Sequence, residues 1–151
     1  MKIVLLERNS AGTDVPVDCF NELGKVTSYP NTVTAEEVAE RVGDADVIVC
    51  NKAPMREESL KNCLNVKLIC ELATGYDNCD LEYCRSRGIK VANVVDYSTA
   101  MVAQHTFTLA LALSQKLPYY DRYVKSGAYS AQDRFSNFDQ PFYELEGKTW
   151  G

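Results

Sequence analysis

Five short apolar runs recur along the N-terminal part of the chain, and longer polar segments separate them. Their centres are almost continuously apolar, which is typical of strands covered on both faces of a parallel sheet. The pattern therefore predicts an α/β fold with five parallel strands and helices on both faces. The runs cover residues 2–6, 26–29, 46–50, 67–72 and 89–94.

Helix signals stand between these runs. Thr34 lies three positions before Glu37, which is the spacing of a capping box. Val38 and Val42 follow at helical spacing, so this segment is predicted to be an amphipathic helix with both valines on the sheet.

A second helix is predicted before the last apolar run. Asp77 or Asn78 is expected to cap it, and it runs through Arg87 to a stop at Gly88. Strands and helices that alternate in this way form right-handed βαβ units. Residues 1–97 are therefore predicted to form one open, doubly wound α/β domain.

The pattern changes in residues 98–151. A long helix there is apolar on most sides, so we expect it to be buried against a second domain or another subunit. A Gly-, Ser- and Asp-bearing loop and the start of a new strand follow. The expected elements are a helix from Ser98 or Thr99 to about Leu117, an interruption at Pro118, a loop over 126–141 and a strand beginning in 144–151.

Composition and charge exclude several partners. The 151 residues carry 16 basic and 21 acidic side chains, a formal net charge of −5, which argues against binding to the phosphate backbone of a nucleic acid. No apolar run approaches the ~20 residues of a membrane helix. The apolar stretch before Glu7 is too short for the core of a signal peptide. We expect a soluble, cytoplasmic chain.

The six cysteines predict neither a metal site nor a disulfide framework. No C-x-x-C pair occurs, and the single histidine, His105, is far from every cysteine in the sequence. Zinc sites need clustered thiolates or imidazoles, and disulfide frameworks belong to small secreted domains. Cys50 and Cys70 lie inside apolar runs, so we expect them to be buried free thiols.

Candidate chemistry lies at the carboxyl ends of the predicted strands, where open parallel sheets bind ligands. Segments 51–54, 73–77 and 96–99 reach that edge. In the second segment, Thr74-Gly75-Tyr76 can present successive backbone N–H groups to a small carboxylate. The other interpretation, which the spacing alone favours, is a plain turn in which the glycine only relieves backbone strain.

Other polar residues also have two interpretations. Lys52 would add positive charge beside such an anion, although an ordinary surface lysine is the favoured interpretation. His105 has no carboxylate three or four positions away, which favours a hydrogen-bonded core or interface residue over a general acid. Residues 10–13, Ser-Ala-Gly-Thr, faintly suggest a phosphate loop, although a turn is favoured.

Six segments follow one another in a specific order. They are ATGYDNCDL (73–81), RGIKVAN (87–93), YSTAMVAQHTF (97–107), LP (117–118), YVKSG (123–127) and LEGKT (145–149). Together they resemble the D-isomer-specific 2-hydroxyacid dehydrogenases, and the match runs from about residue 45 to the end. The pair Asn51-Lys52 is most similar to the glycerate dehydrogenase and hydroxypyruvate reductase branch.

The resemblance implies a flavodoxin-like substrate-binding domain over 1–97, and a linking and dimerisation helix, loop and first Rossmann strand over 98–151. It implies an NAD-dependent enzyme that interconverts small 2-hydroxy and 2-keto acids, and a homodimer. The implied substrate-binding residues are Asn51, Lys52, Thr74, Gly75 and Tyr76, and the implied cofactor-binding residues are Thr74 and Val102.

No G-x-G-x-x-G motif occurs in these residues. The family's catalytic Arg, Glu and His follow the matched segments, so we expect no catalytic residue here, a chain truncated before the NAD-binding motif, and no activity from it alone. A non-catalytic dimerising or ligand-binding module from a shortened gene is the alternative. A flavodoxin or phosphoacceptor domain is a weaker one, because Asn51 stands where a phosphoacceptor would want Asp.

Overall fold

The computed structural model describes residues 1–12 and 14–151. Thr13, the last residue of the predicted phosphate-loop segment, lies outside the described residues. The chain divides into two compact units, Met1–Tyr97 and Ser98–Gly151. Among the described residues, no helix has both the length and the apolar character that crossing a membrane requires.

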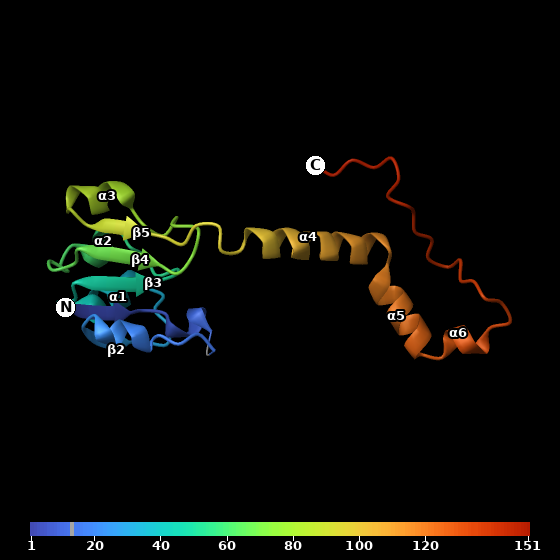
Figure 1. Cartoon of the computed structure of the whole chain (residues 1–151), viewed down its shortest axis with the longest axis horizontal. Coiled ribbons are helices and arrows are strands. Elements are labelled where there is room, and N and C mark those ends of the chain that lie inside the picture. Colours follow the sequence, from blue (N-terminus) through green and yellow to red (C-terminus); the bar gives the residue numbers. More distant parts are fainter. Residues whose placement is uncertain (13) are drawn as a thin grey trace. The chain divides into compact units, whose positions relative to one another are not determined.

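The first unit is built on a five-stranded sheet (Figure 1), and every neighbouring pair of strands in it is parallel. The spatial order is β2-β1-β3-β4-β5, so all five carboxyl ends lie at one edge. The prediction of five parallel strands is confirmed. The strands are β1 (Lys2–Leu5), β2 (Lys25–Ser28), β3 (Val47–Cys50), β4 (Leu68–Glu71) and β5 (Lys90–Ala92).

The predicted capping box forms at the start of α1 (Ala35–Val42). The Thr34 hydroxyl accepts the backbone N–H of Glu37, and the Glu37 carboxylate accepts the backbone N–H of Thr34, both at 3.2 Å. Val38 and Val42 are buried, as their spacing predicts. Two shorter helices follow in this unit: α2 (Glu57–Leu60), which the sequence pattern did not indicate, and α3 (Leu81–Ser86).

Helix α3 begins later than the sequence predicts. Its N-cap is Asp80, so the prediction of Asp77 or Asn78 as the cap is wrong. The cause is a tertiary contact: the backbone N–H of Met55 donates to the carbonyl of Asn78, and that of Asp80 donates to the carbonyl of Met55, both at 2.9 Å. This pairing holds Cys79 in a bridge to Met55, so the helix begins only after Asp80. Gly88 ends this segment as predicted, with a left-handed φ of +71°.

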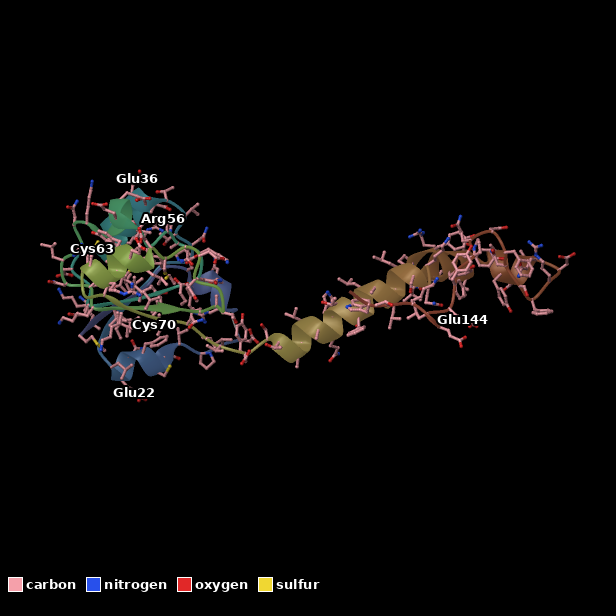
Figure 2. All side chains as sticks on the ribbon, turned by 90° about the horizontal axis from the view of Figure 1, so that it is seen from above. Glu22, Glu36, Arg56, Cys63, Cys70 and Glu144 are labelled. Carbon is pink, nitrogen blue, oxygen red and sulfur yellow. The ribbon has the colours of Figure 1, made fainter. Side chains whose placement is uncertain are left out.

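The two faces of the sheet are covered differently. Val4 and Ile48 belong to the larger core cluster, which also holds buried side chains of α1, α2 and α3. Ile3 and Val49 face the other side, where the short 3₁₀ helix η2 (Asp18–Glu22) is the cover. Figure 2 shows Glu22 on the opposite side of the unit from Glu36 and Arg56. The helical cover of this second face is therefore much thinner.

The second unit contains three helices that match the prediction in part. The first ends at Ser114 rather than Leu117, because Lys116 turns the chain with a left-handed φ of +52°. Pro118 lies in the first turn of the next helix, where a missing N–H costs nothing. The predicted loop contains a further short helix. The elements are α4 (Thr99–Ser114), α5 (Leu117–Lys125) and α6 (Ala128–Ala131).

The strand predicted within residues 144–151 is wrong. That segment has no strand pairing, and a turn forms instead, in which the backbone N–H of Lys148 donates to the carbonyl of Leu145 at 3.0 Å. Gly147, with φ of +71°, allows this turn. A strand needs a neighbour for its backbone hydrogen bonds, and the described residues offer this segment none.

Candidate functional site

The turn after β4 directs its carbonyl groups toward the rest of the unit. The carbonyl of Ala73 accepts the backbone N–H of Val94 at 3.0 Å, and the carbonyl of Thr74 accepts the side-chain amide of Asn93 at 2.8 Å. In a trans peptide the N–H points opposite to the C=O of the same plane. The N–H groups of Thr74 and Gly75 therefore point away from these internal donors.

These N–H groups have no acceptor. Within the part of the chain that the structure describes, the backbone N–H groups of Thr74, Gly75 and Tyr76 make no hydrogen bond, and all three residues are exposed. Adjacent amide donors without partners form a site of positive potential that suits a carboxylate. The turn thus presents the donors that its sequence suggested.

Gly75 does not relieve backbone strain. Its φ lies outside the left-handed region, and an added Cβ would have Asp77 Oδ2 as its nearest neighbour, at an ordinary 3.7 Å. The conformation is therefore one that any residue can adopt. What a glycine provides here is an unobstructed approach of a ligand to the backbone, which favours the binding interpretation over the plain turn.

Two charged side chains flank the turn. Asp77 places a carboxylate within it, which opposes the binding of an anion. Arg56, which precedes α2, donates from its guanidinium to the carbonyl of Asp77 at 3.4 Å and brings a positive charge to the same place. Arg56 was not identified from the sequence, because only the fold brings the segment after β3 to this turn.

The backbone N–H groups of residues 51–53 are already occupied. The buried carboxylate of Glu7, which follows β1, accepts all three at Oε2, at 2.7, 2.8 and 2.9 Å. Only the side chains of Asn51 and Lys52 are left for a ligand, and that of Lys52 is exposed. Glu7 was missed by sequence reasoning, and the one signal was a carboxylate directly after an apolar run.

A second buried carboxylate, Glu71 at the end of β4, connects these loops. Its Oε1 accepts the Asn78 side-chain amide at 2.8 Å and lies 3.1 Å from the thiol of Cys50 and 3.0 Å from that of Cys79. The Asn78 amide also donates to the carbonyl of Ala53 at 3.0 Å. Asn78 therefore ties the loop after β3 to the turn after β4, so the predicted substrate-binding residues lie on two connected segments.

The cysteines are free, as predicted, and four of the six are buried. Cys50 is among them, whereas the prediction that Cys70 is buried is wrong, because the thinner cover on its face of the sheet leaves it only partly buried. Among the described residues, no three metal-ligating side chains form a metal site. Burial, together with the nearby Glu71 carboxylate, raises the pKa of the Cys50 and Cys79 thiols. Burial likewise raises the pKa of Cys63, Cys70 and Cys84. At neutral pH these five groups are protonated thiols and weak nucleophiles.

We expect Cys19, the one exposed cysteine, to react with a chromogenic disulfide reagent far faster than the others in the native protein at neutral pH. All six should react after unfolding in guanidinium chloride. Counting released thiolate against time measures both phases, and Cys19→Ser should remove the fast one. A buried thiol that reacts as fast as Cys19 would show that the core of the first unit opens readily to solvent.

The remaining predicted residues lie elsewhere. Val102 is exposed on α4 in the second unit, and its contact with a cofactor stays a prediction. His105 is also exposed, so its predicted place in a core is wrong, whereas the alternative place at an interface stays a prediction. Residues 8–11 form the 3₁₀ helix η1 (Arg8–Ala11), and Ser10 donates to the carbonyl of Glu7, as in a turn.

Comparison of the chain with known proteins identifies its family. Residues 4–148 match the family described as D-isomer specific 2-hydroxyacid dehydrogenase, catalytic domain. A glycerate dehydrogenase of Methylorubrum extorquens is 35% identical over 150 residues, covering 99% of this chain and 47% of the relative. A hydroxypyruvate reductase of Blautia hydrogenotrophica is 34% identical over 154 residues, covering 100% and 48%. The chain spans about half the length of these relatives.

Solved structures of similar fold agree with this family assignment. A D-lactate dehydrogenase of Aquifex aeolicus, complexed with NAD and lactic acid, has a TM-score of 0.67 and 27% identity, covering 89% of this chain and 39% of that one. An acyclic imino acid reductase in complex with NADPH and D-Arg has a TM-score of 0.74 and 25% identity, covering 84% and 41%. The parallel sheet, the turn after β4 and the match over 4–148 together lead to one conclusion: the chain belongs to the D-isomer-specific 2-hydroxyacid dehydrogenase family.

Proposed function

We propose that residues 1–97 are the substrate-binding part of an NAD-dependent oxidoreductase that interconverts small 2-hydroxy and 2-keto acids of the glycerate, hydroxypyruvate and glyoxylate type. The observation that carries the proposal is that the N–H groups of Thr74, Gly75 and Tyr76 have no acceptor among the residues that the structure describes. The two relatives that match nearly the whole chain, a glycerate dehydrogenase and a hydroxypyruvate reductase, support the choice of acid.

In this proposal the turn binds the carboxylate of the acid. A carboxylate oxygen accepts from the N–H groups of Gly75 and Tyr76, and charge-assisted bonds of this kind are stronger than those between neutral groups. Arg56 adds favourable charge and offsets that of Asp77. Lys52 and Asn51 offer further side-chain donors from the loop that Asn78 ties to the turn. The acid is thereby held in one orientation at the sheet edge.

The chain's own residues fit only the nicotinamide end of a dinucleotide. Thr74 is exposed, with its hydroxyl donating to the carbonyl of Val94 at 3.0 Å, and can lie beside a flat ring. No G-x-G-x-x-G sequence stands before a helix in these residues to bind a pyrophosphate. When bound, NAD(H) supplies the hydride, and the part of this chain is to position the acid. Residues 1–151 by themselves are proposed to be inactive.

The exposed helix α4 supports a homodimer as the proposed assembly. None of its residues is buried, and the apolar side chains of Leu109 and Leu113 are 52% and 73% exposed. A contiguous apolar surface of this kind rarely stays in contact with water. A non-catalytic dimerising module shares this feature, so activity and assembly have to be measured separately.

A titration of the ¹⁵N-labelled chain with D-glycerate tests the acid site. We expect saturable amide shifts centred on Thr74, Gly75 and Tyr76, with a dissociation constant on the order of 1 mM for so small a ligand. Glycerol is the matched control, because it lacks the carboxylate, and it should move none of these signals.

Saturable shifts confined to other residues would contradict the site. Incubating the same preparation with NADH and hydroxypyruvate, while following NADH absorbance, tests the proposed inactivity independently. Hydride transfer by these 151 residues would overturn that part of the proposal and leave the acid site standing.

A further inference from the structure

The turn after β4 is held from one side by the residues that leave β5. Asn93 comes directly after this strand, and its side-chain amide donates to the carbonyl of Thr74 at 2.8 Å. The next residue, Val94, donates its backbone N–H to the carbonyl of Ala73 and accepts the hydroxyl of Thr74, both at 3.0 Å. Two hydrogen bonds thus hold two successive peptide planes of the turn, and the Thr74 hydroxyl adds a third bond to the segment after β5.

The two planes differ in what holds them. The plane between Ala73 and Thr74 is fixed by a backbone donor, which any residue at position 94 other than proline supplies. The plane between Thr74 and Gly75 is fixed by a side chain, the carboxamide of Asn93. A carboxamide carries two N–H donors, whereas leucine, with a similar shape, has none. The direction of the Gly75 N–H therefore depends on which amino acid occupies position 93.

We propose that Asn93 is a positioning residue for the acid-binding turn: by holding the carbonyl of Thr74, it orients the Gly75 N–H toward the carboxylate of the substrate. The inference rests on the proposed function of the turn. Asn93 does not need to touch the acid, since its effect passes through one planar peptide group. Without it, rotation of the plane turns the carbonyl oxygen of Thr74 outward, where it repels a carboxylate.

The test compares Asn93→Leu with Asn65→Leu in the full 151-residue chain. Asn65 is a matched control, because its side-chain amide also donates to a backbone carbonyl, that of Asp44 at 3.3 Å, in the segments before β3 and β4. Neither substitution changes the charge. Two readouts are used: the residual dipolar coupling of the Gly75 N–H without ligand, and the dissociation constant for D-glycerate from the amide titration.

For Asn93→Leu we expect an altered Gly75 coupling and binding weakened about tenfold or more, the effect of losing one hydrogen bond to a charged group. Couplings of β1 and β3 amides should match the wild type, which shows that the sheet is intact. Asn65→Leu should change neither readout. If Asn93→Leu does not fold, Asn93→Ser, whose hydroxyl is too short to make the same contact, replaces it.

The possible failures are distinguishable. An unchanged Gly75 coupling or unchanged glycerate affinity in the Asn93 variant would overturn the positioning role while the acid site stands. An altered coupling in a protein whose wild type binds no glycerate would support the orienting contact and refute the proposed function of the turn. If Asn65→Leu raised the dissociation constant for glycerate as much as Asn93→Leu does, general destabilisation would explain both effects, and the inference would be overturned.

Discussion

Replacing Glu7 by leucine is expected to lower the stability of the first unit by about 3–5 kcal/mol. The substitution removes the acceptor of the three N–H groups of residues 51–53. Glu7 is only 6% exposed, so water does not readily replace its carboxylate. Each unsatisfied buried donor costs about 1–3 kcal/mol. For a unit of this size the melting temperature should fall by about 15 °C or more. Thermal unfolding followed by circular dichroism measures the shift.

Two further variants make this expectation specific. Glu7→Gln keeps one carbonyl oxygen near the three donors, so its melting temperature should lie between those of the wild type and Glu7→Leu. Glu22→Leu removes an exposed carboxylate on η2 and should change stability by no more than about 0.5 kcal/mol. A melting temperature for Glu7→Leu equal to that of the Glu22 variant would mean that water replaces the lost acceptor.

Introducing two glutamates on α4, as Leu109→Glu with Leu113→Glu, is expected to convert the proposed dimer into a monomer. These side chains lie four positions apart and share one face of the helix. Burying unpaired carboxylates at an interface costs about 3–5 kcal/mol, so the dissociation constant of the dimer should rise more than about 100-fold. Sedimentation equilibrium over a range of concentrations measures the change.

The control is Leu64→Glu, which makes the same kind of substitution once, at a leucine of the first unit that is 77% exposed. It should leave the dissociation constant unchanged. Because glutamate forms helices nearly as readily as leucine, the helical content of the double variant should be retained. A wild-type chain that is strictly monomeric at high concentration would refute the proposed dimer itself.

Helices and strands that depend only on residues close together in the sequence were predictable. The five strands follow from apolar runs, and α1 follows from a capping box whose two hydrogen bonds join residues three positions apart. The start of α3 was not predictable in this way. Asp77, Asn78 and Asp80 are all acceptable caps, and the choice of Asp80 depends on pairing with Met55, more than twenty positions earlier.

In the candidate site, too, some residues could be predicted from local sequence and others could not. Thr74, Gly75 and Tyr76 could be named because a parallel sheet brings the ends of its strands to one edge, which topology alone determines. Glu7 and Asn93 could not be named. They act on residues 44 and 19 positions away, and nothing in their local sequence marks them as partners of those residues.

By itself, then, the sequence determined the fold class and named the turn after β4 as a candidate source of N–H donors, because these depend on periodicity and on motifs of a few adjacent residues. The tertiary structure alone decided which buried carboxylate occupies the N–H groups after β3, which side chain bonds to the carbonyl of Thr74, and that residues 144–151 form no strand. Those outcomes depend on which distant donor or acceptor lies within about 3 Å, and only the folded chain sets that distance.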